Sequence, residues 1–282
     1  KIRRATDRVF NALPWANCIS DMLISTAKYA PLDSEPLLIT HDEVKRAVVV
    51  VVTSDRGLAG GFNSNVLREA EKLIKAKEKQ GIEVEVIACG KKAIGSFNYR
   101  GVKPIFEFRD LSADPTYEEA AEISAYIGEG YNHGYENGQI DEVTLVFNHA
   151  KNGAEQTLIV QQVLPINMMS FADVLGLEPK EEDVLEPYRD GEKKIPGDVD
   201  FEPDAATVMH QLMVAYLRNT FYYALIDSAA AEQGARRTAM KSATDNATEM
   251  AETLTRLYNR VRQGAITTEI SEIVGGAAAL ED

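Results

Sequence analysis

The stretch that decides the fold is residues 203–282, PDAATVMHQLMVAYLRNTFYYALIDSAAAEQGARRTAMKSATDNATEMAETLTRLYNRVRQGAITTEISEIVGGAAALED. It has no proline after Pro203 and few glycines, and Ala, Met, Leu, Glu, Lys, Arg and Gln favour helix. We therefore predict one long C-terminal helix over 203–282. At about 1.5 Å per residue, such a helix would be on the order of 120 Å long, which exceeds a globular domain and indicates a mechanical or organising role.

Apolar residues in this predicted helix recur in alternating steps of three and four, which is typical of a coiled-coil seam. The seam consists of Met240, Ala243, Ala247, Met250, Leu254, Leu257, Val261 and Gly264. After a slip in register it resumes at Ile266, Ile270, Ile273, Ala277 and Leu280. Small residues at Ala235, Ala239, Ala243 and Ala247 would let a partner helix approach closely. The alternative is a solvated helix, but that would strand the larger apolar side chains in water.

A second seam occupies the start of the chain, at Ile2, Ala5, Val9, Ala12, Ala16, Ile19 and Leu23. Pro14 interrupts it, and an interior proline usually kinks a helix, so we predict one bent helix over 1–30. The economical arrangement pairs the two terminal helices as an antiparallel coiled coil. The middle of the chain then forms a globular insertion.

The middle of the chain reads as an inserted Rossmann-like α/β domain over residues 43–166. Its pattern begins with a β-branched run at 47–52, typical of a buried strand. Further strands are predicted at 83–88, 102–108, 142–148 and 155–164, and helices at 63–80, from 91, and at 116–131. This order favours a small α/β sandwich. Residues 174–202 are predicted to be an acidic connecting loop or insertion.

Charge and cysteine usage exclude several classes of protein. The net charge of -14 opposes general nucleic-acid binding, which needs a basic surface. Cys18 and Cys89 show no metal or disulfide spacing, so a reducing compartment is expected. No apolar run reaches the roughly 18 residues of a membrane span. The chain opens on Lys1 within a helical pattern, and we expect earlier residues in the gene product.

One glycine-rich loop invites a nucleotide-binding interpretation. The sequence TSDRGLAGGFN, residues 53–63, follows a predicted strand and precedes a helix, where dinucleotide folds hold phosphate. However, Gly57, Gly60 and Gly61 do not make G-x-G-x-x-G, and no GK[ST] occurs. The glycines equally suit a tight turn. His41 and His149 are predicted to be surface residues, and no catalytic or metal site is predicted.

Two segments resemble the gamma subunit, the central rotor shaft, of bacterial F-type ATP synthase. They are ARRTAMKSATDNATEMAETLTRLYNRVRQGAITTEISEIVGGAAAL at 235–280 and the loop TSDRGLAGGFNSNV at 53–66. The resemblance implies a non-catalytic rotor without cofactors. Its partners would be three alpha and three beta subunits, the epsilon subunit and the c-ring. It would be peripheral, on the cytoplasmic side of the bacterial inner (plasma) membrane, coupling proton-driven rotation to ATP synthesis or hydrolysis.

The resemblance also carries three sets of candidate contact residues. A polar catch to the surrounding hexamer would comprise Arg262, Gln263, Thr267 and Glu269. An apolar bearing tip would comprise Ile273, Val274, Ala277 and Leu280. A foot contact to epsilon or the c-ring would comprise Phe201 and Glu202. Each set has a plainer alternative: a solvated helix surface for the catch, a fraying terminus for the tip, and a helix start capped by Asp204 for the foot.

Two other functions remain as hypotheses from the residues alone. One is a dinucleotide-binding enzyme with a coiled-coil dimerisation arm, and the other is a coiled-coil scaffold unrelated to ATPases. The segment 178–200 looks longer than the usual connection of the family, and no cysteine-bearing regulatory insert is present. Redox switching is therefore not expected.

Overall fold

The computed structural model describes residues 2–111, 114–135, 138–166 and 200–281. The elements follow in this order: α1 (Ile2–Thr26), η1 (Leu32–Ser34), η2 (Pro36–Leu38), β1 (Arg46–Val52), α2 (Phe62–Glu78), β2 (Glu83–Cys89), α3 (Lys91–Tyr99), β3 (Phe106–Phe108), α4 (Tyr117–Asn132), β4 (Glu142–Ala150), β5 (Gln156–Leu164) and α7 (Ala205–Glu281). The chain divides into two compact units, Lys1–Arg236 and Arg237–Asp282. The predicted acidic connection, residues 174–202, lies outside the described residues as far as position 199. The boundaries predicted for the other segments, at residues 30, 43, 166 and 203, stay predictions.

A five-stranded sheet with the order β3-β2-β1-β4-β5 forms the centre of the first unit. Strand β1 pairs in parallel with both β2 and β4, and β5 closes the edge antiparallel to β4. Every residue of β1 is buried, which is what a β-branched run between two helical layers requires. The α/β class predicted from the sequence is confirmed.

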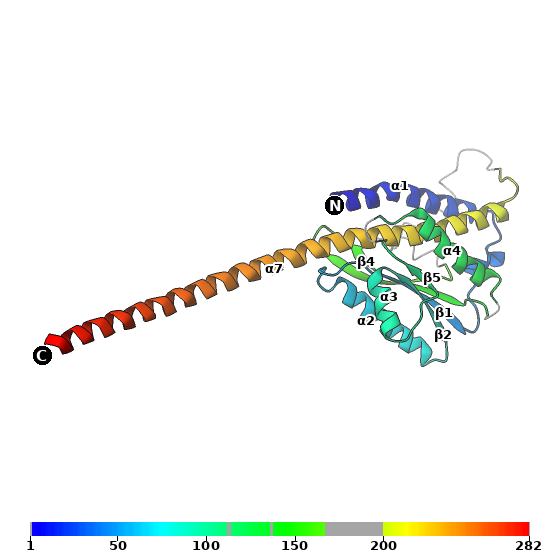
Figure 1. Cartoon of the computed structure of the whole chain (residues 1–282). Coiled ribbons are helices and arrows are strands. Elements are labelled where there is room, and N and C mark those ends of the chain that lie inside the picture. The colour runs from blue at the N-terminus through cyan, green and yellow to red at the C-terminus, as the bar shows by residue number, and fades with distance from the viewer. Residues whose placement is uncertain (1, 112–113, 136–137, 167–199, 282) are drawn as a thin grey trace. The chain divides into compact units, whose positions relative to one another are not determined.

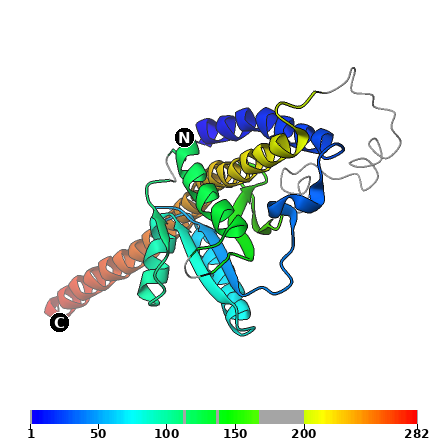
Figure 2. The ribbon, with the colours of Figure 1, turned by 90° about the vertical axis from the view of Figure 1, so that its right-hand side faces the viewer.

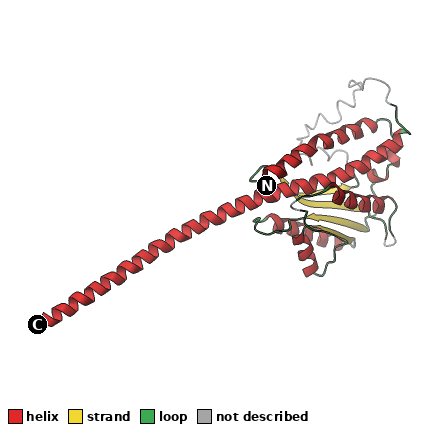
Figure 3. Cartoon of the chain, turned by 45° about the horizontal axis from the view of Figure 1, so that its top comes forward, coloured by secondary structure: helices red, strands yellow, loops and turns green. Residues whose placement is uncertain are grey.

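The valine run of β1 serves two cores because successive side chains of a strand point to opposite faces. Val48, Val50 and Val52 join a core that includes side chains of α1, α4 and α7. Val49 and Val51 join a second core with side chains of α2 and α3. Figure 3 shows the corresponding helices on the two sides of the sheet.

Helix α1 lies beside the first part of α7, and the two run in opposite directions (Figures 1 and 2). Ala16, Ile19 and Leu23, three members of the predicted N-terminal seam, are buried. Ile19 and Leu23 share a core with Met209 and Met213 of α7. The antiparallel pairing is therefore confirmed over this part of α7, and α1 continues through Pro14 as a single helix.

The second half of the α7 seam differs from the expected pairing. From Met240 to Val274 every residue is exposed, so no described segment of the chain covers these apolar side chains. Ala235 is buried, but its neighbours in that core are Ala59 of the glycine-rich loop and Phe62 at the start of α2, and not residues of α1. The physical reason is that helical periodicity defines an apolar face without specifying what packs on it.

Local chemistry explains where two elements begin. Asp204 caps α7, since its Oδ1 accepts the Thr207 N–H at 2.9 Å, and these bonds lower the pKa of its carboxyl group. Strand β3 is shorter than predicted and starts at Phe106. Pro104 lies just before it and has no N–H to give to a ladder.

Candidate functional site

The glycine-rich loop is closed by its own side chains. The Oδ1 atom of Asn63 accepts the Ser54 N–H at 2.9 Å, and Asp55 accepts the N–H groups of Lys91 and Asp110, both at 3.0 Å. Phe62, the first residue of α2, is 1% exposed. A phosphate site at a helix N-terminus needs open backbone amides, whereas here the Phe62 N–H at the start of α2 donates to the Ala59 carbonyl oxygen, and the Lys91 N–H at the start of α3 donates to Asp55. The geometry opposes the nucleotide-binding interpretation.

Two histidines predicted to be surface residues instead pair with carboxylates. His41 Nδ1 lies 2.8 Å from Oδ1 of Asp141, and His149 Nδ1 lies 2.7 Å from Oδ2 of Asp227. The hydrogen bond to Asp227 raises the pKa of His149 above its ordinary value. Both histidines are partly exposed, and their pairing was not predicted because the carboxylates come from distant segments of the chain, which no spacing motif records.

The Asp227 carboxylate lies in α7 and holds the end of β4. It is 1% exposed, and its Oδ1 accepts the Ala150 N–H at 3.1 Å while its Oδ2 faces His149. A buried carboxylate is costly unless it is hydrogen-bonded, and here both oxygens have partners. This contact joins the sheet to the long helix, and sequence reasoning missed it.

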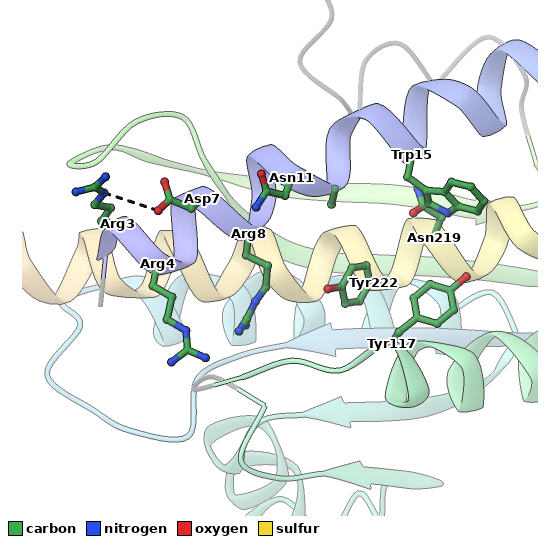
Figure 4. Close-up of a pocket in the computed structure, with 10 residues that line it drawn as sticks. Arg3, Arg4, Asp7, Arg8, Asn11, Trp15, Tyr117, Asn219 and Tyr222 are labelled. Atoms are coloured by element: carbon green, nitrogen blue, oxygen red, sulfur yellow. Dashed lines mark ion pairs between the residues drawn. The ribbon is translucent and has the colours of Figure 1, made fainter.

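An open groove of about 840 Å³ lies between α1, the start of α4 and α7 (Figure 4). Its lining residues include Arg4, Arg8, Trp15, Tyr117 and Tyr222. Both of these arginines pair with the single carboxylate of Asp114, which offsets half of their combined charge. The lining residues offer no group of three metal-ligating side chains, and none is found elsewhere in the described residues.

The four predicted catch residues are all exposed in the second unit. At about 100° per residue, Arg262 and Glu269 fall on one side of the stripe formed by Ile266, Ile270 and Ile273. Gln263 and Thr267 fall on the other side, and the Thr267 hydroxyl donates to the Gln263 carbonyl oxygen at 2.8 Å. The arrangement is an apolar stripe with hydrogen-bonding groups along both edges.

Of the predicted bearing tip, Ile273 belongs to this stripe, and Val274 lies on the edge that carries Gln263 and Thr267. Ile273 is 71% exposed and Val274 is 61% exposed, although both are apolar. Ala277 and Leu280 lie within α7 but beyond the residues whose side chains are described. Exposed side chains of this size on a helix mark a surface suited to burial against a partner.

The predicted foot residues lie just before α7. The Phe201 ring is 5.5 Å from the Tyr29 ring, centroid to centroid, so it packs against the segment that follows α1. Glu202 is exposed. Among the helices described, none is long and apolar enough to cross a membrane.

Comparison with known proteins gives one consistent result. A family model described as ATP synthase matches residues 1–280. The ATP synthase gamma chain of Mycolicibacterium vanbaalenii is 37% identical over 292 residues, covering 100% of this chain and 89% of that one. The gamma chain of Heliobacterium modesticaldum is 39% identical over 286 residues, covering 99% and 89%.

Solved structures share the fold at lower identity. The central stalk and c-ring structure of the mitochondrial ATP synthase from Tetrahymena thermophila matches with a TM-score of 0.59 at 21% identity, covering 86% of this chain and 94% of that chain. A mitochondrial ATP synthase structure from Euglena gracilis, with OSCP, F1 and the c-ring, matches with a TM-score of 0.56 at 17% identity, covering 99% and 94%. The α/β unit with a long C-terminal helix therefore recurs in these two structures.

Proposed function

The chain belongs to the ATP synthase gamma-chain family, and from this premise we propose that it is the non-catalytic rotor shaft of a bacterial F-type ATP synthase. Its outer helix turns within a hexamer of three alpha and three beta subunits. The α/β unit forms the foot, which joins the epsilon subunit and the c-ring. The complex places the chain peripherally on the cytoplasmic side of the bacterial inner membrane.

The observation that best supports this proposal is the exposed stripe on the outer half of α7. Ile266, Ile270 and Ile273 would be costly to leave in water along a helix with no other described cover. A sleeve of surrounding subunits buries such a stripe. Apolar contact is non-directional, so a helix can turn against it without losing specific bonds.

The polar edges of the stripe complement this role. Arg262 and Gln263 together carry several hydrogen-bond donors, and Glu269 carries acceptors. Directional bonds of this kind form at one rotor angle and break at the next. We therefore assign Arg262, Gln263, Thr267 and Glu269 to a catch on the hexamer, Ile273, Val274, Ala277 and Leu280 to the bearing tip, and Phe201 and Glu202 to the foot contact.

The dinucleotide-enzyme hypothesis is not supported. The family assignment favours the rotor, and the Phe62 N–H at the start of α2 is already bonded to the Ala59 carbonyl oxygen. An unrelated coiled-coil scaffold is likewise inconsistent with a family match over residues 1–280.

The direct test is purification of the tagged chain from its native cell in mild detergent. We expect two nucleotide-binding subunits in threefold excess over this chain, together with ATPase activity. Recovery of the chain alone, or as a homodimer with bound nucleotide, would contradict the rotor proposal.

A further inference from the structure

The sheet of the first unit has a position where doubly wound folds bind ligands. Strand β1 pairs in parallel with β2 on one side and with β4 on the other. The chain runs from β1 through α2 to β2, continues to β3 at the edge of the sheet, and then crosses back to form β4 on the other side of β1. The direction of winding therefore changes between β1 and β4. In open α/β sheets, ligands bind outside the carboxyl ends of the strands at such a switch point. Here the loops after Val52 and Ala150 define that crevice.

Helix α7 occupies this crevice in place of a ligand. Ala231 and Ala235 pack with Ala59 and Phe62 of the glycine-rich loop. Small side chains allow this close approach, and at Gly234 even one added Cβ would lie 3.2 Å from the Gly153 carbonyl oxygen. The glycine-rich loop thus receives a helix where related folds receive phosphate.

Directional hydrogen bonds accompany this apolar packing of α7. The Asp227 carboxylate accepts from His149 and from the Ala150 N–H at the end of β4. About two and a half turns later, Arg236 donates to the Gly57 carbonyl oxygen at 3.3 Å and pairs with Glu232. At about 100° per residue, Arg236 lies roughly half a turn around the helix from Asp227.

The position of these contacts along α7 gives them their significance. The first compact unit ends at Arg236, and every residue from Met240 to Val274 is exposed. Within the described part of the chain, these contacts therefore lie at the end of the buried part of α7. Apolar packing alone resists sliding weakly because it is non-directional, whereas hydrogen bonds on two sides of a helix oppose its rotation.

We propose that His149, Asp227 and Arg236, together with the Gly57–Gly61 loop, form a clamp that fixes α7 rotationally in the switch-point crevice of the α/β domain. These are positioning residues, since they touch no nucleotide. The inference rests on the proposed rotor function, because a clamp against rotation matters only where torque passes between the domain and the outer helix.

The test measures torsional stiffness in the complete ATP synthase complex. A rotation probe is attached at Tyr99→Cys, an exposed position on the domain, in a Cys18→Ala background that leaves only the buried Cys89. The angular variance of the probe is recorded during pauses in ATP-driven rotation. Unlike yield or melting temperature, this variance reports twisting between the domain and the hexamer.

The double variant Asp227→Asn/Arg236→Met removes the charged contacts while keeping similar side-chain volumes. We expect a larger angular variance at each pause and a loss of proton pumping per ATP hydrolysed. Amide exchange around Asp227 should be about tenfold faster, as the loss of a buried charged hydrogen bond implies. The milder variant His149→Gln should show a smaller increase in variance and serves if the double variant fails to assemble.

The matched controls are Asp33→Asn and His133→Gln, which change exposed residues of the same unit. Both should keep the parent variance. Unchanged variance in assembled clamp variants would overturn the clamp while leaving the rotor proposal intact. A labelled parent domain that does not rotate during ATP hydrolysis would instead contradict the rotor proposal itself.

Discussion

The Nδ1 atom of His149 lies 2.7 Å from Oδ2 of Asp227, although 78 residues of chain separate the two. The His149 side chain is 27% exposed, whereas that of Asp227 is 1% exposed. A partly solvated imidazole therefore holds a buried carboxylate of α7 at the end of β4. The attachment of α7 to the sheet therefore includes a titratable group, the His149 imidazole.

The first prediction concerns the pH dependence of stability. The Asp227 hydrogen bond raises the pKa of His149 above its ordinary 6.5. A raised folded-state pKa stabilises the fold fully below the unfolded value, and this contribution is lost as pH rises through the folded value. The difference in unfolding free energy between the parent and His149→Gln should therefore be largest below that ordinary value and shrink above the folded one.

Denaturant unfolding of the chain at a series of pH values measures this difference, and NMR titration of His149 gives its pKa directly. Asp227 and Tyr223 are the titratable neighbours that share this environment. His133→Gln, at an exposed position, should show no such trend. A His149 pKa below 6.5 would contradict the prediction.

The second prediction compares two glycines with left-handed backbone. Gly81 has φ +81° and open space around an added Cβ, whereas at Gly90, with φ +95°, that Cβ would lie 2.2 Å from the Thr53 carbonyl oxygen. Gly81→Ala should lose about 1–2 kcal/mol of unfolding free energy from backbone strain alone. Gly90→Ala should lose at least about twice as much, because a backbone atom must also move. Equal losses on thermal or denaturant unfolding would refute the assigned close contact.

The third prediction concerns the catch. Arg262→Ala or Gln263→Ala should lower the ATPase activity or coupling of the assembled complex, since each removes directional donors at the edge of the stripe. The unfolding free energy of the chain should change by less than about 0.5 kcal/mol, because both residues are exposed.

Thr268→Ala provides a control for the catch. At about 100° per residue, Thr268 lies on the side of the helix opposite the stripe and away from both polar edges, and it is also exposed. Thr268→Ala should leave activity closer to that of the parent. An equal loss from Thr268→Ala and Arg262→Ala would argue for a general effect of removing polar side chains and against a specific catch.

The fourth prediction concerns the bearing tip. Ile273→Asp should reduce ATP-driven rotation, because an apolar sleeve would have to desolvate the new carboxylate. Ile273→Val keeps the apolar surface and should rotate nearly as the parent does. Since Ile273 is 71% exposed in the chain, neither variant should alter the melting temperature of the isolated protein appreciably. Normal rotation of Ile273→Asp would remove Ile273 from the bearing surface.

Much of the local structure follows from the sequence because it depends on near neighbours. The absence of proline after Pro203 and the helix-forming composition predicted α7, and Asp204 caps it as expected. The run of valines predicted β1, since β-branched side chains suit a strand buried on both faces. The three-four spacing likewise predicted which face of α1 is buried, and Ala16, Ile19 and Leu23 lie on it.

Only the tertiary structure decided what those faces contact. Periodicity marks an apolar or small-residue face, but several surfaces can cover it, so Ala235 packs with Phe62 at the start of α2 and not with α1. His149 and Asp227 carry no motif, because their pairing depends on how β4 and α7 meet in space. The sequence by itself determined the elements and their buried faces through short-range geometry, whereas the fold determined the partners through contacts between segments far apart in the chain.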